Sequence, residues 1–303
     1  MKKIIVILIA LLPLTLSGQQ FPFMEGYNIN PYNLLPAFAG LHNTKTVFVD
    51  YRSDWSGLDG GPRTYQLSYN DRYGDRVGVG GKFIYDKTDI FKQMLFLATY
   101  SYELTIKKDN LINLALSAGL FKNSIDLGKY YNNPEYVQDL VLLYGSDKSK
   151  MKVATDISAL FHNKQVEAGL LFSNIMFGSA RYKNSSMTYK PLKNYQLFAS
   201  YLFTIDDKWA IKPTVVFRGG QNVPPQLEIA PAVNWNKRFW MSAVYRTGGI
   251  FGAAFGGEVY KGLMINYSYN LSTNVAMNTF GSHQITLGVR IIQPAQNIKQ
   301  ASK

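Results

Sequence analysis

The sequence predicts an all-β fold: a transmembrane antiparallel β-barrel of about 14 strands, with an N-terminal arm packed in or under the lumen. Three observations predict it. Tyr and Phe, which favour strands, account for 21 and 18 of the 303 residues, whereas only 17% of residues are charged, below the roughly 25% of soluble domains. Apolar and small polar residues alternate with a period of two along most of the chain. Short polar turns alternate with longer loops, as in outer-membrane barrels.

Residues 1–18 have the pattern of a secretory signal peptide. Lys2 and Lys3 form a basic start, Ile4–Leu12 is an apolar run, and small residues around Ser17 offer a cleavage site. A membrane anchor is the alternative, but the run is short for a span, and no later stretch has about 18 consecutive apolar residues. We therefore expect export to the outer membrane of a Gram-negative cell, where the chain would be a multi-pass β-barrel.

Residues 19–43 are the predicted arm. Pro22, Pro31 and Pro36 interrupt regular structure, while aromatic side chains lie between them. These aromatic residues argue against a free linker, so we expect the arm to pack on or inside the barrel.

Residues 44–292 are the predicted barrel, and 293–303 a short C-terminal tail. In the first strand Val47 and Val49 alternate with polar residues, and the glycine-rich loop Trp55–Pro62 ends that pattern. We expect both termini on the side of the short turns, in the periplasm. The predicted strands are 44–54, 62–71, 76–86, 91–105, 111–122, 151–162, 164–174, 192–205, 208–219, 225–235, 238–247, 250–260, 262–271 and 282–292.

A soluble β-sandwich is the alternative fold, because its strands also alternate. Its outer face would be richly charged, whereas the polar faces here hold Gly, Ser, Asn and Thr, and rings gather near strand ends as in the girdles of membrane barrels. Pro213 and Pro231 lie within predicted strands, where each would cost a ladder hydrogen bond, so we expect a bulge or distortion at both.

Composition and motifs argue against several classes of function. The net charge is +12, and removal of Lys2 and Lys3 leaves 30 basic against 20 acidic residues, or +10. The basic residues are scattered and no nucleic-acid-binding motif is present, so we expect no nucleic-acid partner. The chain has no Cys, and its three histidines, His42, His162 and His283, are not spaced as metal ligands. Ser282 beside His283 raises the question of a hydrolase, but no complete triad is evident, so we expect no enzyme activity, cofactor or metal.

The predicted inward face carries charges of both signs. They are Asp50, Arg52, Lys82, Asp156, Glu167, Lys212, Arg218, Glu228, Arg246 and Arg290. They would either line a polar pore or pair with one another and fill the lumen together with the arm, because about 14 strands enclose more space than wall side chains fill. Gly78 and Gly80 lie inside a strand and lack the Lys-Ser/Thr of a phosphate loop, so they indicate a bend or close packing in the lumen.

Two motifs resemble one family. The hairpin loop from Arg52 to Thr64 is similar to the PorP/SprF pattern Arg-x-Gln-Trp, a Gly two residues on, then Gly-Ala-Pro-x-Thr, with Asp54 for the Gln and Gly61 for the Ala. In the arm, Tyr27-Asn28-Ile29-Asn30 followed by Leu35-Pro36-Ala37-Phe38-Ala39-Gly40 resembles the family's Asn-Pro-Ala-x-x-Gly, with Leu35 in the Asn position.

The resemblance implies an outer-membrane barrel of Bacteroidota that serves the type IX secretion system. It would be non-enzymatic and would assist or anchor secreted proteins at the surface, with gliding motility as one such process. A passive channel for small solutes is the alternative. The implied partners are outer-membrane lipid, a secreted surface protein such as a large adhesin, and periplasmic type IX or peptidoglycan-linked components.

The two motifs supply the candidate residues for partner binding or for the plug. They are Tyr27, Asn30, Pro36, Gly40, Arg52, Trp55, Gly57, Gly60, Pro62 and Thr64. Trp55 is a large amphipathic side chain of the kind that anchors interfaces, although a place in the aromatic girdle would explain it too. Gly57, Gly60 and Gly61 would let the loop take positive φ, and Pro62 would fix the entry into the next strand.

Overall fold

The structure is a computed structural model that describes residues 24–41, 45–127, 147–148, 151–176, 180–181, 188–189, 194–220, 223–273 and 281–291. The predicted signal peptide over 1–18, the predicted tail over 293–303, and His42 lie outside the described residues. The structure therefore leaves these expectations as predictions.

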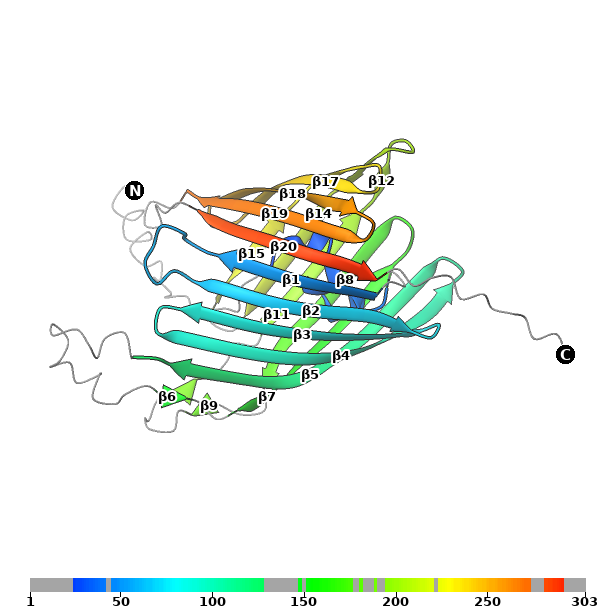
Figure 1. Cartoon of the computed structure of the whole chain (residues 1–303). Helices are drawn as coiled ribbons and strands as arrows, with labels where there is room; N and C mark the ends of the chain where they lie inside the picture. The colour runs from blue at the N-terminus through cyan, green and yellow to red at the C-terminus, as the bar shows by residue number, and fades with distance from the viewer. Residues whose placement is uncertain are drawn as a thin grey trace, which may run out of the picture.

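The main sheet is antiparallel and closes on itself as a 14-strand barrel, because the first strand pairs with both the second and the last (Figure 1). Three positions in the wall consist of two successive labelled pieces, β11 with β12, β13 with β14 and β15 with β16, and the short β6 extends the position of β7 beside β5. The predicted fold class is confirmed, and the strand bounds agree with the predicted segments to within a few residues. The bounds are β1 Lys45–Ser53, β2 Arg63–Tyr73, β3 Val77–Thr88, β4 Phe91–Lys107, β5 Asn110–Ile125, β6 Asp147–Lys148, β7 Lys152–His162, β8 Val166–Met176, β9 Ala180–Arg181, β10 Thr188–Tyr189, β11 Asn194–Tyr201, β12 Phe203–Thr204, β13 Trp209–Lys212, β14 Thr214–Gly220, β15 Val223–Ile229, β16 Ala232–Trp235, β17 Phe239–Arg246, β18 Ile250–Tyr260, β19 Leu263–Ser272 and β20 Ser282–Ile291.

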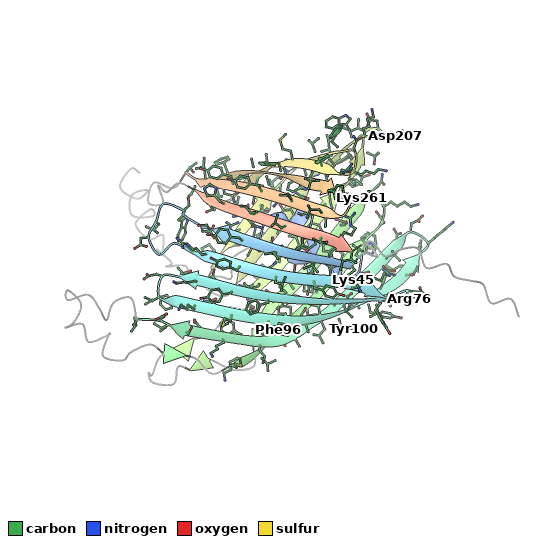
Figure 2. The ribbon with its side chains drawn as sticks, in the orientation of Figure 1. Lys45, Arg76, Phe96, Tyr100, Asp207 and Lys261 are labelled. Atoms are coloured by element: carbon green, nitrogen blue, oxygen red, sulfur yellow. The ribbon has the colours of Figure 1, made fainter. Side chains whose placement is uncertain are left out.

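The wall has an apolar outer face and a small, polar inner face. Along β2 exposed and buried residues alternate, with Leu67 48% exposed and Ser68 fully buried. Phe96 and Tyr100 likewise stand on the outer surface of β4 (Figure 2). An apolar belt around a closed barrel, in which strands pair all the way round, is the arrangement that a lipid bilayer requires. Among the described residues, no helix is long and apolar enough to cross a membrane.

Aromatic side chains gather at both ends of the outer face, as predicted. Tyr51, Tyr65 and Tyr85 lie side by side on β1, β2 and β3, with ring centroids 5.1 and 6.2 Å apart. At the other end, the rings of Trp209 and Trp235 are 6.4 Å apart. These positions fit rings at the two membrane interfaces.

Pro213 and Pro231 each interrupt the ladder, as expected, but without a bulge. They stand opposite each other, since the register runs from Lys212↔Ala232 to Val215↔Ile229 without a shift. Neither proline has an N–H to donate, so each leaves one ladder hydrogen bond unmade. The wall is therefore weakened at one level across neighbouring strands.

The arm lies inside the barrel (Figure 1), as the predicted fold has it. It consists of three 3-10 turns, η1 Gly26–Asn28, η2 Pro31–Asn33 and η3 Pro36–Phe38, of which the last two begin with a proline whose fixed φ suits the first helical position. Leu34, Leu35 and Phe38 pack into an apolar cluster with inward residues of the wall. The arm thus brings its own core into the lumen.

The arm runs from one end of the barrel to the other. Strand β1 begins, and β20 ends, at the end of the short turns, which Lys45, Arg76, Asp207 and Lys261 mark in Figure 2. Glu25, however, contacts residues beside the longer loops, at the opposite end. The expectation for the termini therefore fits the barrel strands but not the start of the arm, which crosses the lumen before β1.

Candidate functional site

Arg52 joins the arm to the first long loop. It occupies an inward position near the end of β1, and its side chain is 8% exposed. Its guanidinium forms an ion pair with Glu25 Oε1 at 3.0 Å, and it donates through Nε and Nη2 to the Asp54 carboxylate at 2.6–3.0 Å. Such a two-pronged contact fixes both partners in direction as well as distance. Arg52 thereby connects the plug in the lumen with the Trp55 loop.

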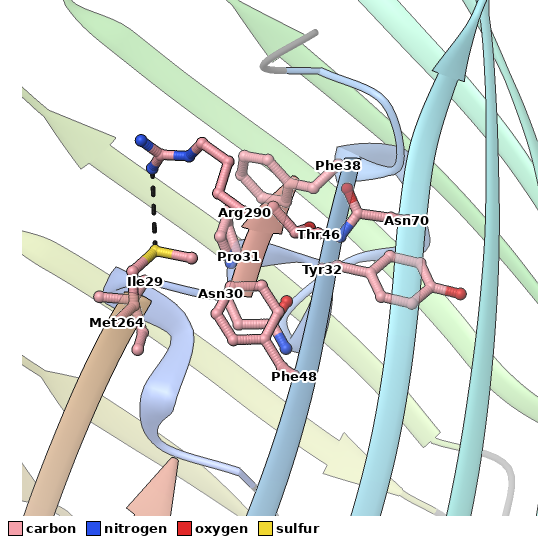
Figure 3. A pocket seen from close by; sticks show the side chains of 10 residues that line it. All are labelled: Ile29, Asn30, Pro31, Tyr32, Phe38, Thr46, Phe48, Asn70, Met264 and Arg290. Atoms are coloured by element: carbon pink, nitrogen blue, oxygen red, sulfur yellow. Dashed lines mark hydrogen bonds between the residues drawn. The ribbon is translucent and has the colours of Figure 1, made fainter. Parts of the chain in front are cut away.

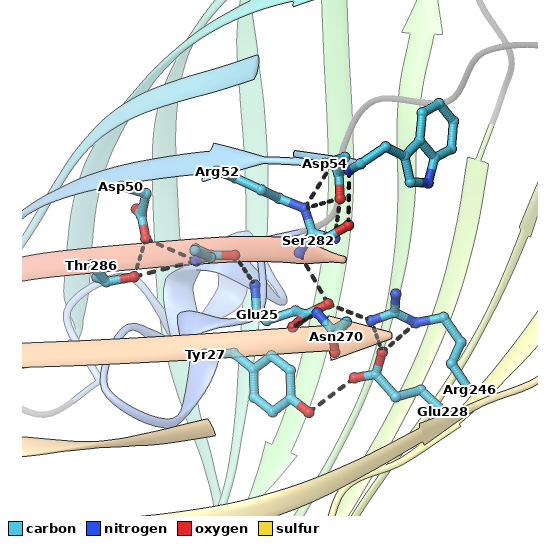
Figure 4. Close-up of polar contacts among 12 residues, drawn as sticks. Glu25, Tyr27, Asp50, Arg52, Asp54, Glu228, Arg246, Asn270, Ser282 and Thr286 are labelled. Atoms are coloured by element: carbon cyan, nitrogen blue, oxygen red, sulfur yellow. Dashed lines mark hydrogen bonds and ion pairs between the residues drawn. The ribbon is translucent and has the colours of Figure 1, made fainter. Parts of the chain in front are cut away.

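Glu25 is bound entirely by side chains of the barrel wall (Figure 4). We call this binding site, formed by Arg52, Arg246, Asn270 and Gln284, the seat of Glu25. Its carboxylate accepts from Arg246 Nη2 at 2.8 Å and from Asn270 Nδ2 at 2.6 Å, and its backbone N–H donates to Gln284 Oε1 at 2.8 Å. Burial alone would raise the pKa of Glu25, but Arg52 and Arg246 outweigh it and hold that pKa well below its usual value. Glu25 is therefore a buried anion, and its charge is matched by the wall.

A second carboxylate, Glu228, completes the network. It is fully buried and accepts from Arg218 and from Arg246, each at 2.6 Å, and from the Tyr27 hydroxyl at 2.9 Å. Three arginines, Arg52, Arg218 and Arg246, thus face three carboxylates, Glu25, Asp54 and Glu228. The cluster is neutral only while the arm is in place. We call the long-loop end of the barrel the mouth, and these six side chains the mouth network.

The Trp55 loop is held in a defined shape. Trp55 has φ +50°, its N–H donates to Ser282 Oγ at 3.4 Å, and Ser56 N–H donates to the Gly281 carbonyl at 2.9 Å. A bulky residue with positive φ is uncommon, because its Cβ crowds the backbone, and the surrounding contacts must maintain it. The Trp55 side chain is half-exposed, and Leu58 at the tip is 52% exposed.

Only one of the three glycines of this loop has the predicted positive φ. Gly60 has φ +77°, as expected, but neither Gly57 nor Gly61 has positive φ. A Cβ on Gly61 would lie 2.9 Å from the Asp54 carbonyl oxygen, so that glycine is needed for close approach of the backbone. Pro62 accepts the Asp54 N–H at 2.9 Å and closes the base of the loop. The prediction of positive φ was wrong for Gly57 and Gly61 because a sequence does not distinguish the two uses of glycine.

The remaining candidate residues are spread along the lumen. Asn30 donates to Ser68 Oγ at 3.0 Å, and Thr64 donates to Asp86 Oδ1 at 2.7 Å. Pro36 and Gly40 are buried in the part of the arm nearer the short turns, and Gly40 has φ +74°. The structure therefore brings Tyr27, Arg52 and the Trp55 loop together at the long-loop end but leaves Pro36 and Gly40 away from them.

Gly78 and Gly80 make room for the arm. A Cβ on Gly78 would overlap the Ala39 carbonyl, and one on Gly80 would lie 2.9 Å from the Tyr32 ring. Tyr32 is buried and its hydroxyl is 2.6 Å from Thr99 Oγ1. Close packing in the lumen, one of the two expectations for these glycines, is therefore what they provide.

A small cavity remains beside the arm near the short turns (Figure 3). Its volume is about 60 Å³, and it is bounded by Asn30, Phe48 and Arg290 among others. Arg290 also pairs with Glu258 at 3.0 Å. The cavity is large enough for a few water molecules and lies away from the mouth network.

Ser282 and His283 occupy opposite faces of β20 and do not form a catalytic pair. Ser282 is buried on the inner face, and its Oγ accepts a hydrogen bond from Trp55 N–H. His283, the next residue, is on the other face, and its Nδ1 lies 2.7 Å from the Tyr267 hydroxyl. Adjacent strand residues cannot act on one substrate from opposite faces. No group of three His, Cys, Asp or Glu side chains in the described part of the chain is placed to hold a metal ion.

Sequence reasoning missed Glu25 and Asn270. Glu25 stands in the irregular arm without a periodic pattern, and its partner Arg246 is 221 positions away. The only available signal was the excess of inward arginines over inward carboxylates near the long loops. That excess indicates that an anion is needed near these arginines, but it does not indicate which residue of the chain supplies the anion.

The comparison with family models decides the identity of this barrel. A model described as "Type IX secretion system membrane protein PorP/SprF" matches residues 16–289. The chain belongs to the PorP/SprF family. Together with the closed barrel and its apolar outer belt, this places the protein in the outer membrane as part of type IX secretion. No curated protein matches this PorP/SprF chain.

Solved structures resemble the PorP/SprF barrel at low identity. The CymD monoaromatic hydrocarbon channel is 11% identical, with a TM-score of 0.49, and covers 90% of this chain and 93% of its own. The toluene transporter TodX of P. putida is 9% identical, with a TM-score of 0.49, and the match covers 85% of this chain and 92% of TodX. A KdgM porin is 8% identical, with a TM-score of 0.41, and the match covers 82% and 99%.

Proposed function

We propose that this barrel is a non-enzymatic accessory protein that assists or anchors proteins secreted by the type IX system, and so displays them at the cell surface. Its partners would be a secreted surface protein such as a large adhesin, periplasmic type IX or peptidoglycan-linked components, and the lipid of the outer membrane. In gliding species the displayed protein would serve motility.

One observation carries the proposal. Arg52 pairs with Glu25 of the arm and with Asp54 beside Trp55, so the start of the arm and the loop motif meet at the mouth. The arm occupies the space that a solute would need, and the shaped loop offers Trp55 and Leu58 to a macromolecule. Large aromatic side chains held in place are the usual anchors of protein interfaces.

A display experiment tests the proposal. Trp55→Ala, and separately deletion of residues 19–43, should abolish surface labelling of the secreted protein while the barrel keeps its heat-modifiable gel mobility. Tyr65→Ala, which removes another outer-face ring at the same end, is the control and should leave display intact. Normal display in both mutants would rule out the proposed role, and a pull-down from detergent with mass spectrometry would identify the partner.

The alternative, a passive channel for small solutes, makes a different prediction. Purified protein in a planar bilayer should then show steady conductance, and deletion of residues 19–43 should change it little. An accessory barrel filled by its arm should conduct weakly, and more strongly once the arm is removed.

A further inference from the structure

We propose that the seat of Glu25 is a carboxylate-binding site of the barrel wall, which takes an acidic side chain from a segment of a secreted partner when the front of the arm withdraws. This inference rests on the proposed function, because it names what the partner presents to the barrel. The ligand class is an acidic peptide.

The seat does not depend on the identity of the arm. Arg52 comes from β1, Arg246 from β17, Asn270 from β19 and Gln284 from β20, and their contacts with Glu25 use only its carboxylate and its backbone N–H. Every polypeptide with an acidic residue carries those two groups. The same four contacts can therefore be made by a segment of another protein.

Charge requires that the seat be refilled. Without Glu25, the mouth network holds three arginines against Asp54 and Glu228, a net charge of +1. A buried charge without a counter-charge is costly, whereas exchange of one carboxylate for another keeps the cluster neutral. Withdrawal of the front of the arm and arrival of an acidic side chain are therefore coupled.

The front of the arm is held differently from the rear. Tyr27, Leu34, Leu35 and Phe38 of the arm belong to the apolar cluster, whereas Met24 and Glu25 do not. Residues 24–26, the front of the arm, can therefore leave while the arm from Tyr27 onward stays packed. Because the arm is attached to the barrel, its effective concentration is high, and a partner needs further contacts to compete with it. Exposed Leu58 and half-exposed Trp55 beside the seat provide them.

The wall beside the front of the arm also has unused polar groups. Both amide atoms of Asn266, Ser268 Oγ and Asn270 Oδ1 are buried and have no hydrogen-bond partner in the described part of the chain. These three residues alternate along the inward face of β19, and the Asn266 amide is 3.4 Å from where a Cβ of Gly26 would lie. Buried polar groups are normally satisfied, so this row offers hydrogen bonds to a different backbone.

Peptide binding to the purified full-length protein in detergent tests the site. The probes are a fluorescent peptide with the sequence of residues 24–33 and its counterpart with Gln in place of Glu25. Two variants empty the seat by different routes: Glu25→Gln removes the charge, and Gly26→Val pushes the front of the arm away, since a Cβ there would lie 2.6 Å from Thr286 Oγ1. Each should bind the Glu peptide at least about tenfold more tightly than the Gln peptide, as expected for charge-assisted hydrogen bonds.

The matched control is Glu258→Gln, which removes an inward glutamate that pairs with Arg290 at the other end of the barrel. It should behave as the unaltered protein, whose seat is filled, and bind neither peptide well. Equal binding of the two peptides, or no binding by variants with normal heat-modifiable mobility, would overturn the site. If the peptides showed no carboxylate preference but Trp55→Ala cells still failed to display the secreted protein, the proposed function would hold and the carboxylate site would not. If the peptides showed the preference but display in Trp55→Ala cells was normal, the carboxylate site would hold and the proposed function would not.

Discussion

At the scale of single residues, Gly78 allows the arm to pack against the wall because it has no side chain. We expect Gly78→Ala to displace the arm and to destabilise the protein by about 1–3 kcal/mol, because the added methyl group overlaps the Ala39 carbonyl. Protease sensitivity of the arm and denaturant unfolding would measure the effect. Gly81→Ala is the control, since its nearest neighbour, the Leu97 carbonyl oxygen, would be 3.9 Å away; similar damage from both would refute the close packing.

Leu287 and Thr286 are adjacent residues of β20 that occupy opposite faces of the wall. Leu287 is 48% exposed on the outer face, so Leu287→Arg should destabilise the barrel by about 2–4 kcal/mol if it lies at the bilayer midplane. The polar face of a strand would ordinarily tolerate Arg better. Thr286 is fully buried, however, and a Cβ on Gly26 of the arm would already lie 2.6 Å from its Oγ1, so Thr286→Arg should release the arm. Urea titration would report the first effect, and limited proteolysis of residues 24–41 the second.

The pairing of inward charges shows what a sequence can and cannot predict at this scale. The period of two places Glu228 and Arg246 on the inner face, and the structure confirms it. Which charges meet depends on strand register and on the arm, neither of which follows from alternation. Of the two expectations for these charges, ion pairs rather than an open row are found at Arg218, Arg246 and Glu228.

At the scale of elements, the front of the arm should respond to acid. The pKa of Glu25 in the folded protein is below its usual value of 4.5, so its ion pairs contribute stability that is fully present above that pH and is lost as the pH falls further. The protection of residues 24–28 from hydrogen exchange, relative to the intrinsic rate at each pH, should therefore decrease below pH 4.5 but not between neutral pH and 4.5. The Glu25→Gln protein should show no such change, and an identical acid response in that variant would assign the effect to another group.

Strands and arm differ in how far the sequence predicts them. A strand between lipid and a polar lumen must alternate, and so the segments in 44–292 can be read from the residues alone. The arm has three short 3-10 turns without a period, and its contacts lie far away in the chain, such as Tyr27 with Glu228 at a separation of 201. The sequence therefore predicts that the arm packs, but not where it begins, which way it runs or what holds Glu25.

At the scale of the whole molecule, the two ends of the barrel should be on opposite sides of the membrane. Long loops of outer-membrane barrels face outward, and the chain has no cysteine, so single cysteines report cleanly. Asp59→Cys at the mouth should react with a membrane-impermeant maleimide on intact cells. Lys261→Cys, in a short turn, should react only after the outer membrane is opened. The reverse pattern would invert the orientation.

The arm also has a consequence for the order of assembly. It leads into β1, which closes the barrel against β20, the last strand of the sheet. Two residues beside the front of the arm, Gln284 and Thr286, are on β20, and the hydrogen bond from Glu25 N–H to Gln284 spans 259 positions. Contacts between residues so far apart in sequence form late in folding, because the intervening chain must first be in place. Closure of the barrel and seating of the arm are thus one cooperative step, and a nascent chain that ends before residue 282 can complete neither.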